Sequence, residues 1–131
     1  MGISKNVVIW FEIPVADMDR AIRFYQEVFL LELSRNKFET VEMAWFPWNI
    51  DTNIQGSSGS LVYNPEFYKP SIEGTLVYFS SQSDDLNDEL GRVESAGGRI
   101  IIPKTQISED IGYMGVFIDS EGNRIALHSR K

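Results

Sequence analysis

The chain has 131 residues, 43% of them hydrophobic and 24% charged, which is the size and composition of one globular domain with a buried core. Its formal net charge of −7 leaves no basic stripe for nucleic acid. No cysteine and a single histidine, His128, exclude disulfides, cysteine metal sites and any site that needs two imidazoles. No apolar run is long enough to span a membrane and no signal peptide precedes the first strand-like run, so we expect a cytoplasmic protein.

The first half of the chain predicts a strand, a helix and three more strands. Residues 7–15 read VVIWFEIPV, and such β-branched and aromatic runs favour a strand. Asp17 is expected to cap the helix that follows. The apolar residues of that helix recur at spacings of three and four: they are Met18, Ala21, Ile22, Tyr25, Val28 and Phe29. Further strands are predicted at 31–35, 39–48 and 60–63, with a Gly-, Ser- and Asn-rich, mobile loop at 49–59.

The second half repeats this order. A strand at 75–80 leads to a helix that Asp84 or Asp85 is expected to cap and that Gly97-Gly98 ends. Strands follow at 99–102, 113–118 and 124–128, and a turn over 119–122 joins the last two. We therefore predict an α+β fold of two βαβββ modules, residues 1–64 and 75–131, joined by a linker at 65–74. Each sheet has one face covered by its helix, and we expect the two bare faces to pair and enclose a cleft.

Three segments carry a resemblance to a known family: residues 11–25 (FEIPVADMDRAIRFY), 96–98 (AGG) and 117–128 (FIDSEGNRIALH). In this order and spacing they resemble the vicinal oxygen chelate superfamily, which includes glyoxalase I, bleomycin-resistance proteins, fosfomycin-resistance enzymes and extradiol dioxygenases. The resemblance covers almost the whole chain. It implies the paired-module fold, a homodimer, and lyase, isomerase or dioxygenase chemistry on a small molecule.

Metal-dependent members of that superfamily hold the ion with His and Glu side chains on the first and last strand of each module. The matching positions here are Trp10, Ser60, Leu76 (or Thr75 if the register shifts by one) and Ala126. Indole and alkyl groups do not bind a divalent ion, and one serine hydroxyl is a poor ligand. We therefore expect no metal and no other cofactor. A displaced metal site that uses Glu12 and His128 stays open as an alternative.

Strand alternation places further residues on the same faces, two positions along each strand. These residues are Glu12, Val62, Tyr78 and His128. Glu12 and His128 are the candidate catalytic residues. Glu12 is either a general base or the anchor of a cationic group, and the alternatives are a shifted register or a structural ion pair. His128 is a proton-transfer partner or a satisfied structural histidine.

The predicted pocket is mostly apolar and aromatic, which suits a small organic ligand. Its expected binding residues are Trp10, Trp48, Ser60, Val62, Leu76, Tyr78 and Ala126. We expect Trp45 in the core and Trp48, beside the loop, in contact with the ligand. Three functions stay open: a metal-independent lyase or isomerase, a protein that sequesters an antibiotic or another ligand without turnover, and a regulatory module with a weak ligand.

Overall fold

The elements follow the order βαβββ twice along the chain. The computed structural model describes residues 2–51 and 55–131, so part of the predicted loop at 49–59, residues 52–54, lies outside the described residues. The first module contains β1 (Trp10–Pro14), α1 (Met18–Phe29), β2 (Ser34–Phe38), β3 (Val41–Trp45) and β4 (Ser58–Tyr63). The second contains β5 (Val77–Ser80), α2 (Asn87–Val93), β6 (Arg99–Ser108), β7 (Gly112–Ile118) and β8 (Arg124–Ser129).

Each module forms its own four-stranded sheet, with strand orders β1-β4-β3-β2 and β5-β8-β7-β6. β1 pairs in parallel with β4, and β5 in parallel with β8, while the other pairs are antiparallel. The two sheets have the same topology, and β1 and β5 are edge strands. The predicted α+β fold of two βαβββ modules is confirmed.

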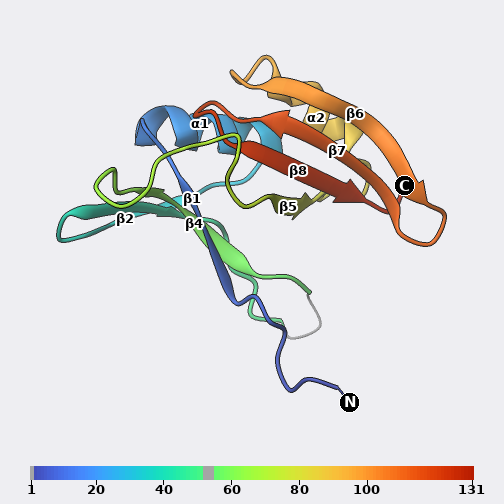
Figure 1. Cartoon of the computed structure of the whole chain (residues 1–131), viewed down its shortest axis with the longest axis horizontal. Coiled ribbons are helices and arrows are strands. Elements are labelled where there is room, and N and C mark those ends of the chain that lie inside the picture. Colours follow the sequence, from blue (N-terminus) through green and yellow to red (C-terminus); the bar gives the residue numbers. More distant parts are fainter. Residues whose placement is uncertain (1, 52–54) are drawn as a thin grey trace.

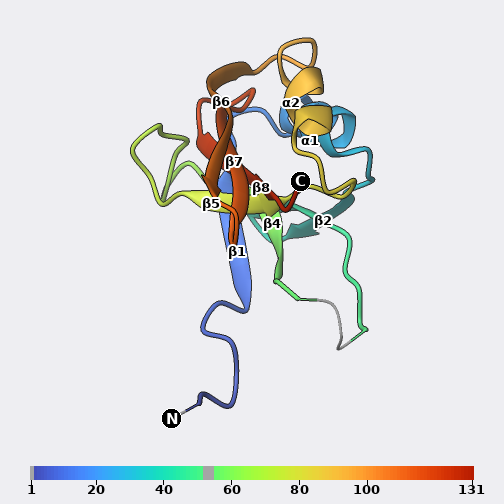
Figure 2. The ribbon, with the colours of Figure 1, turned by 90° about the vertical axis from the view of Figure 1, so that its right-hand side faces the viewer.

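The two helices lie against each other on one side of the molecule, and each also packs on strands of its own module (Figures 1 and 2). One buried cluster draws on both modules, and the Phe24 ring of α1 contacts the Phe117 ring of β7 with centroids 5.9 Å apart. The modules therefore join through their helix-facing sides. The expectation that their bare faces pair is wrong, because burial of the helix-side aromatic residues already holds the modules together.

Local signals set most helix ends. Asp17 caps α1 as predicted, because its side chain accepts a hydrogen bond from the Arg20 N–H at 3.1 Å. Beyond α2, Gly97 takes a φ of 109°, and the Gly98 N–H donates to the Val93 carbonyl in the pattern of a Schellman motif. Of the two predicted caps of α2, Asp84 is wrong, since it takes a φ of 67° and accepts from the Arg130 N–H. Asp85 instead accepts from the N–H of Asn87, the first residue of the helix, at 3.0 Å.

A buried polar group joins α1 to the turn between β7 and β8. The Tyr25 hydroxyl donates to Asp119 Oδ2 at 2.6 Å, and both side chains are buried. Asp119 also accepts from the N–H groups of Glu121 and Asn123 and from the Asn123 amide. Burial, then Asp119, raises the pKa of Tyr25 far above its ordinary value, so the phenol stays a donor. Because Tyr25 belongs to the first module and Asp119 to the second, this bond fixes one module on the other.

Glu121, in the same turn, supports the start of α1. Its carboxylate accepts from the backbone N–H groups of Ala16 and Asp17 at 2.9 and 2.8 Å and from the Arg20 guanidinium at 2.8 and 3.0 Å. Burial alone would raise the pKa of Glu121, but the hydrogen bonds from Arg20, Asp17, Ser120 and Ala16 outweigh it and hold the pKa below its ordinary value. The predicted turn is therefore confirmed, and it is also an intermodule contact.

Candidate functional site

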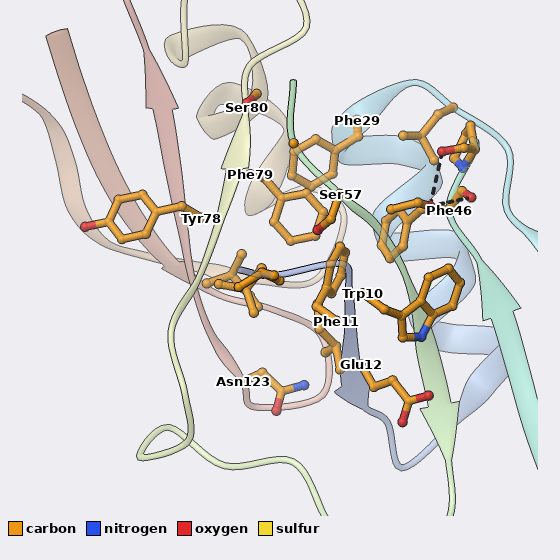
Figure 3. Close-up of a pocket in the computed structure, with 18 of the residues that line it drawn as sticks. Trp10, Phe11, Glu12, Phe29, Phe46, Ser57, Tyr78, Phe79, Ser80 and Asn123 are labelled. Atoms are coloured by element: carbon orange, nitrogen blue, oxygen red, sulfur yellow. Dashed lines mark hydrogen bonds between the residues drawn. The ribbon is translucent and has the colours of Figure 1, made fainter. Parts of the chain in front are cut away.

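A groove runs between the edge strands β1 and β5, where the two sheets approach each other without sharing backbone hydrogen bonds in the described part of the chain. Its volume is about 1940 Å³. Besides the two strands, its walls include the end of α1, the start of α2, the connection from β4 to β5 and the first residues of β8. In Figure 3, Ser80 lies at one end of the groove, and Glu12 and Asn123 lie at the other. We call the latter the Asn123 end.

Phenylalanine rings from both modules form the inner wall of this groove. Phe11 of β1 contacts Phe79 of β5 with ring centroids 5.6 Å apart, and Phe29 of α1 stacks on Phe79 at 4.7 Å. Phe46 closes the set, 5.4 Å from Phe79 (Figure 3). These rings face the shared core on one side and the groove on the other. The wall is thus apolar and aromatic, and the packed core fixes its shape.

One polar contact in the groove is a carboxylate–phenol pair. The Tyr68 hydroxyl donates to Glu12 Oε1 at 2.5 Å. Burial, followed by the hydrogen bond to Glu12 and its charge, raises the pKa of Tyr68 well above its ordinary value. Tyr68 therefore keeps its proton at physiological pH. The structural ion pair predicted as one alternative for Glu12 is not seen, because the partner of its carboxylate is a phenol and not a basic side chain.

Two contacts hold the connection between the modules beside the groove. One is the Tyr68–Glu12 bond, and the other lies three residues on, where the Ser71 N–H donates to Asn123 Oδ1 at 3.1 Å. The Asn123 amide in turn donates to the Pro14 carbonyl at 2.8 Å and to Asp119. Asn123 thereby joins the end of β1, the β7–β8 turn and the connection at one point. The Asn123 end of the groove is consequently built from fixed backbone.

The structure separates the predicted site residues into two groups. Those that line the groove are Trp10, Glu12, Trp48, Leu76 and Tyr78. The others, Ser60, Val62, Ala126 and His128, share the faces predicted for them by strand register but lie outside the groove walls. Ser60, Val62 and Ala126 are buried. The His128 Nε2 atom lies 2.7 Å from the Ile111 carbonyl, away from Glu12's groove. The catalytic role of Glu12 with His128 stays a prediction.

A second, smaller hollow of about 610 Å³ lies on the uncovered face of the first sheet, the face opposite the helices. All three tryptophans of the chain line it, and the rings of Trp10 and Trp45 meet edge to face at 6.2 Å. Trp45 is 36% exposed, so its predicted place in the core is wrong. Ala44 and Phe46, the neighbours of Trp45 in β3 and just beyond it, fill the core instead.

The residues at the family's metal positions do not fit a divalent ion. Trp10 offers an indole N–H, which is only a donor, and Leu76 and Ala126 offer no ligand atom. The Ser60 hydroxyl is already bonded to the carbonyls of Ala44 and Leu61. Over residues 2–51 and 55–131, no three His, Cys, Asp or Glu side chains gather into a possible metal site. Glu12 and His128 therefore do not complete a displaced site within these ranges, and we derive no step through a metal.

Residues 7–127 match the model of the Glyoxalase/Bleomycin resistance protein/Dioxygenase superfamily. The chain belongs to this superfamily. The resemblance seen in the sequence is thereby confirmed, and the superfamily accounts for the two sheets and their common strand order. No curated protein matches the sequence. In the part of the chain that the structure describes, no helix has the length and apolar character to cross a membrane.

Several solved structures share the fold. A glyoxylase/bleomycin resistance protein/dioxygenase domain from Frankia sp. EAN1pec is 19% identical with a TM-score of 0.71, and the match covers 98% of this chain and all of that one (100%). A hypothetical protein from S. aureus is 17% identical with a TM-score of 0.68, covering 96% and 95% of the two chains. Glyoxalase I from Zea mays is 16% identical with a TM-score of 0.66, covering 92% of this chain and 45% of that one. These identities carry the fold alone.

Sequence reasoning missed several residues of the groove. Tyr68 lies in the predicted linker, where no local pattern indicates that its hydroxyl reaches β1. Asn123 and Arg124 belong to the segment that carries the family resemblance, yet only the folded chain brings them to the groove. The available signal for Asn123 was its place after the Asp119–Gly122 turn, because Asn and Asp side chains at turns commonly bond nearby backbone.

Proposed function

We propose that the chain binds a small organic molecule in the groove between β1 and β5, with the Glu12–Tyr68 pair as a polar contact. The observation that carries the proposal is the arrangement itself: an aromatic wall shared by both modules and one hydrogen-bonded carboxylate–phenol pair at the same groove. Apolar walls with a few placed polar groups are typical of small-molecule sites. Superfamily membership supports the proposal, because the fold hosts many small-molecule functions. It does not select one of these functions.

Substitutions of the carboxylate and of the phenol test this proposal. Native mass spectrometry and ligand-observed NMR with a fragment library would compare wild-type protein with Glu12→Gln and Tyr68→Phe. We expect both variants to lose affinity for polar fragments that bind the wild type, because each removes half of the pair. Glu27→Gln is the matched control, since Glu27 is exposed on α1 and does not line the groove. Unchanged fragment binding in both groove variants would contradict the proposal.

A second candidate is catalysis by the same pair. In this candidate Glu12 removes a proton from a bound molecule and returns it at another atom, and Tyr68, whose raised pKa keeps it protonated, acts as a hydrogen-bond donor beside it. Proton abstraction and return of this kind is the chemistry of an isomerase or a lyase. Exchange of a ligand C–H proton with deuterated water would report it, and Glu12→Gln should abolish that exchange. Tight binding without exchange or product would instead support a sequestering protein.

A homodimer and a cytoplasmic location remain predictions. The dimer prediction rests on the superfamily resemblance. Native mass spectrometry tests it directly.

A further inference from the structure

Two cationic side chains, Arg124 and Lys69, line the Asn123 end of the groove. Within residues 2–51 and 55–131, neither side chain makes a hydrogen bond or an ion pair in the structure. Arg124 is half-buried, and arginines withdrawn from water are usually paired. The chain carries 19 acidic against 12 basic side chains, so carboxylates are in excess. An unpaired, half-buried arginine in such a chain indicates a partner that is not part of the protein.

The backbone that carries these cations is fixed. Arg124 follows Asn123, which is held to Pro14, Ser71 and Asp119, and it begins β8. Ile125 pairs with Val77, so Arg124 stands beside the start of β5 at the edge of the groove. Lys69 lies between Tyr68 and Ser71, both of which are anchored by the bonds described above. Neither cation depends on a loose loop for its position.

The carboxylates of the groove offset this end only in part. Glu12 lies at the same end, where one of its oxygens accepts from Tyr68, and it forms no ion pair within residues 2–51 and 55–131. Asp88 and Glu89 belong to α2, and Glu89 accepts from the Gln82 N–H, two residues beyond the end of β5 at Ser80. Figure 3 places Ser80 at the opposite end of the groove from Asn123. The Asn123 end thus carries two unpaired cations against the one carboxylate of Glu12, whereas the acidic residues of α2 lie towards the other end.

We propose that the groove takes a molecule with an anionic group, a carboxylate, which the Arg124 guanidinium holds with assistance from Lys69. The planar guanidinium matches a carboxylate with two parallel hydrogen bonds, and charge-assisted bonds of this kind are stronger than neutral ones. The apolar part of the molecule then lies along Leu76 and the Phe11–Phe79 wall. This inference rests on the proposed function and names its ligand class: small organic acids rather than cationic compounds.

Two probes of one shape test the charge preference. Phenylpropionate carries a carboxylate, and phenylpropanol replaces it with a neutral hydroxymethyl group. We expect calorimetric titration at about pH 7 to show the acid binding wild-type protein about tenfold or more tightly than the alcohol. Arg124→Gln should lower the affinity for the acid by about tenfold and leave that for the alcohol within about twofold. The preserved affinity for the alcohol also reports that the groove is intact.

Further variants separate a local effect from a change in overall charge. Lys69→Gln should weaken acid binding by a smaller factor, because Lys69 is exposed. Arg23→Gln, on the exposed face of α1 and outside the groove, changes the net charge equally and should leave both affinities unchanged. Arg124→Lys should keep part of the preference, because it keeps the charge but loses the two-pronged geometry.

The outcomes also separate this inference from the proposed function. If wild-type protein bound the alcohol as tightly as the acid, or if Arg124→Gln kept the preference, the anionic-ligand inference would fail while the groove remained a binding site. If wild-type protein bound neither probe at millimolar concentration, the groove would not be a site for such molecules, and both proposals would fail for this class.

Discussion

Removing the Tyr25 hydroxyl should measure how strongly the two modules are held together. In Tyr25→Phe the ring stays in place, but Asp119 loses its bond of 2.6 Å from the phenol. The three other bonds that Asp119 accepts, from the N–H groups of Glu121 and Asn123 and from the Asn123 amide, are retained. A buried hydrogen bond to a charged group contributes about 1.5–3 kcal/mol. We therefore expect the free energy of unfolding to fall by about 2 kcal/mol, a large share of the roughly 5–15 kcal/mol of a typical domain.

The assay is equilibrium unfolding in urea, followed by tryptophan fluorescence and circular dichroism, together with thermal melting. For a chain of this length, a loss of about 2 kcal/mol should lower Tm by roughly 5–10 °C. Tyr63→Phe is the matched control, because Tyr63 is 38% exposed and its hydroxyl makes no hydrogen bond with the residues that the structure describes. It should change stability by less than about 0.5 kcal/mol. If Tyr25→Phe were no more destabilising than this control, the bond would contribute nothing net to joining the modules.

Three further outcomes follow from the structure. The pKa of Glu121 is held below its ordinary value of 4.5, so the stability that its carboxylate contributes is complete above about pH 4.5 and is lost as pH falls through the folded-state pKa. In urea titrations between pH 5 and 3, we therefore expect Glu121→Gln to lose less free energy of unfolding than wild type. An equal loss in the two proteins would contradict this. Gly59→Ala places a Cβ against the Phe11 ring, so it should displace that ring and weaken phenylpropanol binding. Gly91→Ala is the control, because its Cβ would meet no described atom within 4 Å, and it should leave that binding unchanged. Equal affinity of the two variants for phenylpropanol would argue against Phe11 as a groove wall. Native mass spectrometry at tens of micromolar should give twice the chain mass of 14.9 kDa, and a single-chain mass would count against the dimer.

The sequence predicted those parts of the fold that depend on neighbouring residues. The Asp17 cap, the glycine ending after α2 and the Asp119–Gly122 turn each follow from the preferences of a few adjacent residues, and the structure confirms them. Strand ends were less well predicted. The strand predicted at 99–102 continues to Ser108 as β6, because irregularities in its pairing with β7 let it run on past Pro103.

The parts that depend on distant residues could not be predicted. β3 and the residue after it carry apolar side chains on both faces, Met43 and Trp45 on one and Ala44 and Phe46 on the other, so alternation alone does not say which face the helix covers. The groove presents the same difficulty. Tyr68 belongs to it only because the connection between the modules folds back over β1, which no spacing along the chain encodes.

The separation of the two sheets has a consequence for how this scaffold accommodates change. The described residues of β1 and β5 share no ladder of backbone bonds, so the spacing of the two edges depends on side-chain contacts between the modules, among them the contact of the Phe11 and Phe79 rings. The two rings therefore help to set the distance between the two sheets. Replacing either ring with a smaller or larger side chain should alter the width of the groove while leaving the backbone hydrogen bonds within each sheet intact. For the binding function proposed above, this predicts that substitutions at Phe11 and Phe79 change the preferred size of the ligand without changing the preference for charge that we assign to Arg124.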